Sequence, residues 1–179
     1  ARMLLKGTKS KSSSEIARQI DLLAGTLTPY NGRNLFGLSG RFLNKDIKDV
    51  LKLLKELLVE TSMTERELTR VKREVLSEIR QRDDDPVSFT FLRFNEAIFA
   101  GHPYSRDPMG SEKDVEALSV KDIGDLYRAY VTPRGAVLAL SGDIDEKEVF
   151  SYLEELFGGW EGPKTGLARV GAGRVGKEI

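Results

Sequence analysis

The sequence predicts an α+β fold of two layers, in which helices pack on one face of a largely antiparallel sheet. Helical patterns outnumber strand patterns by about two to one, and the first two strands follow each other as a hairpin. No strand runs into a glycine-rich loop that binds phosphate, which argues against a doubly wound parallel fold. The domain is predicted to comprise residues 1–160, and the glycine-rich residues 161–179 to form a linker or tail.

The first part of the chain predicts one helix and the hairpin. Residues 12–15 form a capping-box signature, and apolar residues then recur at helical spacing from Ile16 to Leu23. Residues 26–31 and 35–42 are expected to be strands, because a polar turn separates two extended stretches.

Helices dominate the middle of the chain. Apolar residues at helical spacing predict a helix over 44–60, and a second capping box opens a longer helix over 64–82. A further helix starts at Asp85 and Pro86, because aspartate is a good cap and proline suits the first turn.

The last part of the chain alternates short helices with one strand. Ser111 and Ser119 are expected to cap two short helices, and Asp145 to open a final helix that ends at Gly158. Between them, residues 135–141 read Gly-Ala-Val-Leu-Ala-Leu-Ser, which is the best strand pattern in the sequence.

Composition excludes several classes of function. The 179 residues carry 28 Lys and Arg against 28 Asp and Glu, which leaves no basic excess to neutralise nucleic-acid phosphates. The absence of cysteine excludes disulfides, thiolate zinc sites and cysteine nucleophiles. With His102 as the single histidine, this chain alone cannot build a site that needs two imidazoles.

The sequence contains no apolar run of the roughly 20 residues that a membrane span requires. No signal peptide is visible near the start. Because the chain begins abruptly at Ala1, we expect it to be a piece of a longer protein, with any targeting signal outside it. A cysteine-free chain suits the cytoplasm and the periplasm equally, so the compartment stays open.

Five segments occur in the order and spacing of a known enzyme family. They read Met-Leu-Leu-Lys-Gly-Thr at 3–8 with Ser-Glu-Ile-Ala at 14–17, Ala-Gly-Thr-Leu-Thr-Pro-Tyr at 24–30, Arg-Glu-Val-Leu-Ser-Glu-Ile at 73–79, Gly-His-Pro-Tyr at 101–104 and Gly-Asp-Ile-Asp at 142–145. In these segments the chain resembles the pitrilysin/insulinase family of zinc metallopeptidases, which includes the mitochondrial processing peptidases. The resemblance implies a two-layer α+β domain that pairs with a sister domain in a clam-like chamber.

The resemblance also implies where a zinc site would lie, and that its residues are missing. Active members carry His-x-x-Glu-His directly before the Met-Leu stretch, and a glutamate on a later helix is the third ligand. Here Ala1 stands at the glutamate of the motif and Arg2 at its second histidine, while Glu78 holds the third-ligand position. A guanidinium has no lone pair for zinc and stays charged, so we expect Arg2 to form an ion pair with Glu78.

Restoring the first histidine upstream would still leave fewer than the three protein ligands of a catalytic zinc. We therefore expect no catalytic residue and no metal in this chain, which is not a zinc hydrolase on its own. Zinc is instead expected in a homologous catalytic half or subunit, whose chamber this non-catalytic half would close around a peptide substrate. Without the resemblance, Glu74 and Glu78 are simply an acidic helix face with basic neighbours.

The family binds substrate as an extended strand that adds to an edge strand near the zinc. Its counterpart here consists of Thr26, Leu27, Thr28, Pro29 and Tyr30. Proline removes one hydrogen-bond donor of the ladder, so this edge is expected to be a poorer template for a peptide.

Two alternatives remain open. The chain is a truncated active metalloendopeptidase domain if the native residues before Met3 read Glu-His. It is a structural assembly subunit if it resembles the family-related core proteins of respiratory cytochrome complexes. An isolated domain is also expected to form a homodimer, because it exposes apolar surface meant for its sister.

The remaining conspicuous residues have simpler explanations. His102 lies in an irregular loop and is expected to be a local hydrogen-bonding residue. Phe91, Phe94 and Ile98 are expected to be the buried stripe of a helix rather than a peptide groove. The aspartates at 83–85 lack the alternating ligands and glycine of a calcium loop, so a helix cap explains them.

Overall fold

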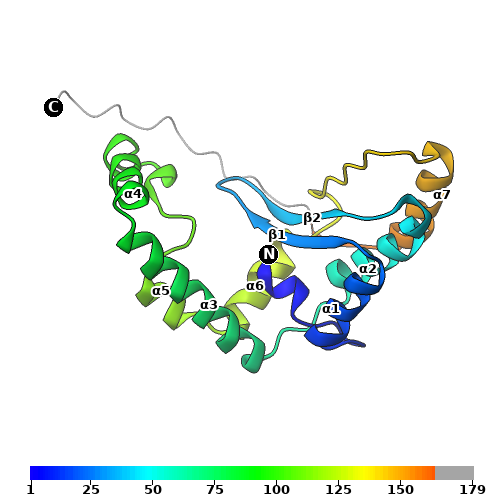
Figure 1. Cartoon of the computed structure of the whole chain (residues 1–179), viewed down its shortest axis with the longest axis horizontal. Helices are drawn as coiled ribbons and strands as arrows, with labels where there is room; N and C mark the ends of the chain where they lie inside the picture. Colours follow the sequence, from blue (N-terminus) through cyan, green and yellow to red (C-terminus); the bar gives the residue numbers. More distant parts are fainter. Residues whose placement is uncertain (164–179) are drawn as a thin grey trace.

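The computed structural model describes residues 1–163 and confirms an α+β fold with an antiparallel sheet (Figure 1). In this part of the chain the sheet is the predicted hairpin of β1 (Thr26–Asn31) and β2 (Phe36–Arg41), with Pro29 opposite Leu38. The helices, in chain order, are η1 (Arg2–Leu5), α1 (Ser13–Leu22), η2 (Asn44–Asp46), α2 (Ile47–Val59), α3 (Glu65–Asp84), α4 (Pro86–Ile98), η3 (Pro103–Ser105), α5 (Glu112–Ala117), α6 (Val120–Tyr130) and α7 (Glu146–Phe157). The predicted tail at 161–179 lies almost wholly outside the described residues.

The molecule has two arms that the hairpin bridges (Figure 1). One arm contains α1, α2 and α7, the other contains α3, α4 and α5, and α6 lies between them. Helices α1, α2 and α6 lie on one side of the hairpin, and the two arms extend past its ends to α4 and α7. None of the described helices is long and apolar enough to cross a membrane.

The predicted helix caps are confirmed. Each cap side chain accepts a hydrogen bond from the backbone N–H three residues later, which satisfies a donor that the helix itself leaves free. These caps are Ser12, Thr64, Asp85, Ser111, Ser119 and Asp145. The helix predicted over 44–60 differs slightly, because its first turn is the 3₁₀ turn η2.

The core lies around α2. Leu53 and Leu57 are at most 1% exposed and pack with Ile16 of α1 against the inner face of the hairpin, and Leu51 is equally buried. Leu53 is buried because α1 and the hairpin cover this side of α2, and α7 also packs against the helix. A smaller cluster at η1 and α3 contains Met3 and Leu68.

The strand predicted at 135–141 is wrong for this structure, which assigns no strand to these residues. Val137 is 92% exposed, and Leu138 and Leu140 are 45% and 40% exposed. The residue types favour a strand, but a strand also needs a neighbour to pair with its backbone groups. Here the segment is irregular and lies open to solvent.

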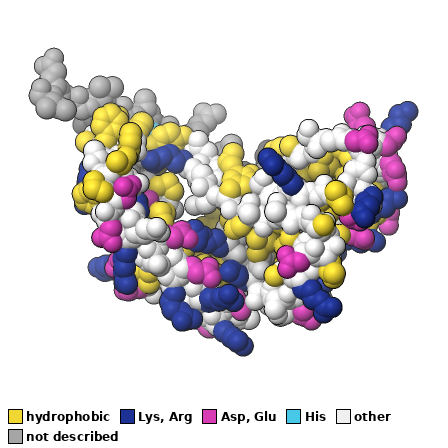
Figure 2. Space-filling view, viewed as in Figure 1, with side chains coloured by type: hydrophobic (Ala, Val, Ile, Leu, Met, Phe, Trp, Pro, Cys, Tyr) yellow, Lys and Arg dark blue, Asp and Glu magenta, His cyan; other side chains and the backbone are white. Residues whose placement is uncertain are grey.

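The predicted burial of the α4 stripe is also wrong. Phe91, Phe94 and Ile98 are 63%, 56% and 52% exposed, and Val87 extends the same apolar face at 63%. Helix α4 packs only its other side, against α3 and η3. Figure 2 shows hydrophobic side chains gathered at the upper left, where Figure 1 places α4. The apolar face exists as predicted, but no described residue covers it.

Candidate functional site

The predicted ion pair between Arg2 and Glu78 is confirmed. Arg2 Nη1 donates to Glu78 Oε1 at 2.7 Å, and Nη2 donates to Oε2 at 2.6 Å. This two-bond geometry matches the planar guanidinium to the carboxylate. The hydrogen bonds from Arg2 hold the pKa of Glu78 below its ordinary value, although partial burial opposes the shift. Both oxygens of Glu78 are thus engaged by a permanent positive charge.

A second ion pair lies one helical turn away on α3. Lys6 Nζ lies 3.4 Å from Glu74 Oε2, and Arg70 also approaches Glu74 at 3.5 Å. Together with the Arg2–Glu78 pair, the Lys6–Glu74 pair ties residues 2–6 to α3 at two successive helical turns. The acidic helix face predicted at Glu74 and Glu78 is therefore neutralised by basic residues from its own helix and from η1.

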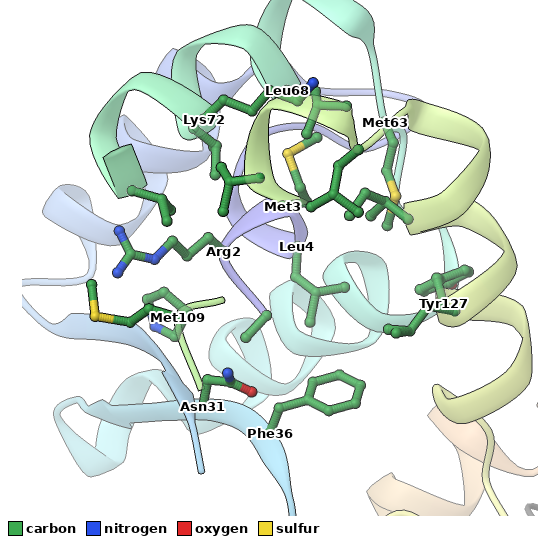
Figure 3. Close-up of a pocket in the computed structure, with 18 of the residues that line it drawn as sticks. Arg2, Met3, Leu4, Asn31, Phe36, Met63, Leu68, Lys72, Met109 and Tyr127 are labelled. Atoms are coloured by element: carbon green, nitrogen blue, oxygen red, sulfur yellow. The ribbon is translucent and has the colours of Figure 1, made fainter. Parts of the chain in front are cut away.

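A cavity of about 430 Å³ opens beside the Arg2–Glu78 pair. Its walls come from η1, the hairpin, α3, α6 and the loop after η3, as Figure 3 shows. Most lining side chains are apolar, including Met3, Leu4, Phe36, Met63 and Leu68. This volume lies within the range of ligand pockets, about 300–1,000 Å³. The cavity can therefore take a bulky apolar group next to β1.

The far wall of the cavity is fixed by Tyr127 on α6. Its hydroxyl donates to the carbonyl of Leu58 at 2.7 Å, at the end of α2. Burial raises the pKa of Tyr127, so the phenol keeps its proton and its donor role over a wider pH range. This bond joins the central helix to the core arm of the molecule.

The predicted substrate strand is β1, which contacts η1 and α1 and is the strand of the hairpin nearer the helices (Figure 1). Leu27 and Pro29 are partly buried on its inner face, while Thr26, Thr28 and Tyr30 are exposed. The ring of Tyr30 lies over Gly37 in β2, where an added Cβ would come 2.9 Å from the tyrosine oxygen. Among the described residues β1 pairs with β2 alone. One edge of β1 therefore has no strand beside it.

The tip of the hairpin makes contacts that the sequence did not reveal. Arg33 and Asn34, in the turn between β1 and β2, bind Tyr104 in η3. The partners lie 70 and 71 residues apart, and neither side has a motif that indicates the other.

Two family descriptions match the sequence. The description "Insulinase (Peptidase family M16)" matches residues 1–112, and "Peptidase M16 inactive domain" matches residues 117–177. The chain belongs to the insulinase family, M16. An uncharacterized zinc protease of Mycobacterium leprae is 25% identical over 175 residues, which make up 97% of this chain and 39% of that protein. The chain thus spans well under half the length of the curated relatives it matches.

Solved structures share the fold of this M16 chain. The M16 inactive domain from Pseudomonas fluorescens superposes with a TM-score of 0.82 at 21% identity, covering 96% of this chain and 42% of that one. The periplasmic protease PqqL from Escherichia coli superposes with a TM-score of 0.86 at 15% identity, covering 97% and 20%. At these identities the likeness establishes the fold alone.

The residues that the resemblance assigns to the zinc positions do not fit a metal ion. Arg2 carries a permanent positive charge, has no lone pair for a metal and occupies both oxygens of Glu78. Within residues 1–163, no group of three or more His, Cys, Asp or Glu side chains is arranged to hold a metal ion. These residues offer an ion pair where a hydrolytic site would need open ligands.

The other candidate residues have local structural roles. His102 caps η3, because its Nδ1 accepts a hydrogen bond from the N–H of Tyr104 at 3.1 Å. Asp85 caps α4 by accepting from the N–H of Ser88 at 2.9 Å. Both predictions of a local role are confirmed.

Proposed function

We propose that this chain is the non-catalytic half of an M16 zinc peptidase. In this proposal it completes the substrate chamber for a catalytic half that carries His-x-x-Glu-His and zinc. The observation that supports the proposal is the bidentate pair of Arg2 with Glu78, at the two residues where the resemblance to the family leads us to expect metal ligands. The curated relatives are named zinc proteases and are more than twice as long as this chain, which leaves room for a second half.

Exposed apolar surface supports a partner half. The α4 face of Val87, Phe91, Phe94 and Ile98 is more than half exposed at every position. A contiguous apolar patch of this kind marks a protein interaction site in soluble proteins. A homologous catalytic half is the partner that the family membership suggests.

The substrate class in this proposal is an extended peptide. The free edge of β1 supplies backbone groups for strand addition, and the adjacent cavity receives an apolar side chain. Pro29 has no N–H, so the ladder has one donor fewer than a regular edge strand. This half would therefore grip the peptide without the strength of a complete ladder.

The zinc content of the whole protein tests the division of roles. We expect one zinc per pair of halves, held by the catalytic half, and Glu78→Gln to leave both zinc content and peptide cleavage unchanged. Glu74→Gln is the matched control, because it lies one turn away with a similarly exposed side chain, 40% against 42%. Loss of zinc in Glu78→Gln alone, measured by elemental analysis, would show that this chain holds the metal.

Hydrogen exchange tests the peptide site. With the glutamate of the catalytic motif replaced by glutamine, a long unfolded peptide should bind without being cut. We expect the amides of residues 26–31 to exchange more slowly in that complex. The alternative predicts a different result in two experiments. If the assembly is stable, but the peptide does not protect residues 26–31 and the protein with the intact motif cleaves no peptide, the chain is a structural assembly subunit.

A further inference from the structure

The tip of the hairpin is anchored to a distant part of the chain by several bonds at once. Arg33 Nη1 donates to the carbonyls of Tyr104 and Arg106, the second at 3.1 Å. The Arg33 guanidinium also lies 5.7 Å from the centre of the Tyr104 ring. Asn34 and the Tyr104 hydroxyl are hydrogen-bonded, with Nδ2 to oxygen at 2.7 Å and oxygen to Oδ1 at 3.0 Å. These contacts of Arg33 and Asn34 with Tyr104 are called the tip anchor below.

The residue that receives the tip is itself held firmly. The Tyr104 ring meets His102 edge-on at 4.8 Å and Phe99 edge-on at 5.8 Å, between ring centres. Its backbone N–H donates to His102 Nδ1, and η3 packs against α4. Edge-to-face packing of aromatic rings fixes ring orientation as well as distance. Tyr104 therefore presents its hydroxyl and carbonyl at a defined place on the second arm.

The tip anchor connects two segments of the chain that line the cavity beside the Arg2–Glu78 pair. Asn31 and Phe36 line the cavity from the two strands on either side of the turn. Met109, from the loop that follows η3, lines it from the other arm (Figure 3). The anchor joins these two walls beyond the strand ends, so it sets the separation between β1 and the opposite loop.

We infer that Tyr104 is a positioning residue, which acts through Arg33 and Asn34 to hold the β1–β2 hairpin in the orientation that binds an extended peptide. The inference rests on the proposed peptide site at β1. A two-stranded hairpin is marginally stable alone, and its tip residues at 30–35 are exposed. When only a fraction of molecules holds the binding-competent orientation, the apparent affinity falls by that fraction. The tip anchor raises this fraction without touching the peptide.

A double-mutant cycle on the whole protein, with its catalytic half silenced as above, tests the inference. Tyr104→Phe removes the hydroxyl but keeps the ring contacts, and Asn34→Ala removes its partner. We expect each variant to weaken the binding of a long unfolded peptide by about fivefold, because each removes the hydrogen-bonded contact between Asn34 and the Tyr104 hydroxyl. The double variant should bind no more weakly than either single variant, because both substitutions remove the same two hydrogen bonds.

Local hydrogen exchange supplies a readout that general destabilisation would not reproduce. Amides of the hairpin should exchange faster in Tyr104→Phe and Asn34→Ala, while those of α2 stay unchanged. Tyr130→Phe is the matched control, since this exposed tyrosine on α6 has no hydrogen bond from its hydroxyl among the described residues. Unchanged hairpin exchange in both variants, or additive losses of affinity in the double variant, would overturn the inference.

The two proposals fail in different ways. If wild type binds no peptide at β1, the proposed substrate site is wrong, and faster hairpin exchange in Tyr104→Phe then shows an anchor without a peptide role. If wild type and both variants bind the peptide equally while it protects residues 26–31, the substrate site stands and the positioning role of Tyr104 is refuted.

Discussion

Helices α2 and α4 both have 13 residues, but the apolar face of α2 is buried and that of α4 is exposed. Both carry an apolar face at helical spacing. Helix α2 buries Leu51, Leu53 and Leu57 to 1% or less, between α1 with the hairpin and α7. Helix α4 leaves Phe91 and Phe94 more than half exposed. Periodicity therefore identifies which face of a helix is apolar, but not what covers that face.

Truncating a core side chain on α2 should have the largest effect. Leu57→Ala is expected to lower the free energy of unfolding by about 2–5 kcal/mol, because it empties space at a residue that is 0% exposed. Urea denaturation followed by circular dichroism measures the change. Leu22→Ala is the matched control, since Leu22 is 75% exposed and should lose less than about 0.5 kcal/mol. Equal losses would mean that the α2 core is not the stabilising centre.

A polar contact of α2 should rank second. Glu56 accepts hydrogen bonds from Thr8 at 2.6 Å, Ser10 at 2.5 Å and Lys11, and its side chain is only 13% exposed. Glu56→Gln is expected to cost about 1–3 kcal/mol at neutral pH, because bonds to a charged group are lost. Glu155→Gln on the exposed face of α7 should cost much less in the same denaturation experiment.

The stability that Glu56 contributes should depend on pH in a defined direction. Burial raises the pKa of Glu56, but the hydrogen bonds from Lys11, Ser10 and Thr8 together lower it below the ordinary 4.5. A lowered pKa in the folded state adds stability above the unfolded value, and this stability is lost as pH falls through the folded value. The difference between wild type and Glu56→Gln should therefore be constant near neutrality and shrink below about pH 4.5. A difference that grows on acidification would contradict this account.

Breaking the Arg2–Glu78 ion pair should cost less stability than the changes in α2 and more than the change in α4. Its side chains are 39% and 42% exposed, so solvent screens the attraction and Arg2→Ala should cost about 1 kcal/mol or less. Added salt should reduce that cost further. A loss of several kcal/mol that salt does not change would show that the pair is buried in the whole protein.

Replacing the exposed face of α4 should have the smallest effect on stability. The double variant Phe91→Ser, Phe94→Ser should change the free energy of unfolding by less than about 1 kcal/mol, because both rings already contact water. The double variant should also reduce self-association of the isolated chain, measured by sedimentation velocity, because the exposed apolar face of α4 favours contacts between molecules. Unfolding of this variant at moderate temperature would mean that α4 is covered within the monomer.

Local features of this fold were predictable from the sequence, and distant ones were not. Helix caps such as Ser12 and Asp85 act within three residues, so their geometry is written in the local pattern. The pair of Arg2 with Glu78 joins residues 76 positions apart and was predictable only through the resemblance to a family. The bond between Asn34 and Tyr104 has no such guide, because a turn asparagine and a loop tyrosine are ordinary residues in their places.

The failure at 135–141 has the same origin as the failure at α4. Val137 and Leu138 have the side chains of a strand, but pairing depends on a neighbouring backbone that lies elsewhere in the chain or outside it. Sequence patterns describe what a segment prefers, and burial depends on the surfaces that meet it.

The open segment at 136–140 has a practical consequence for handling the protein. Its side chains are apolar, and no strand among the described residues pairs with its backbone N–H and C=O groups. It also contains neither a charged residue nor a proline that would interrupt such pairing. Such a run is a template for cross-β stacking between molecules. We therefore expect the isolated chain to aggregate through this segment when it is concentrated, even at temperatures well below its melting temperature.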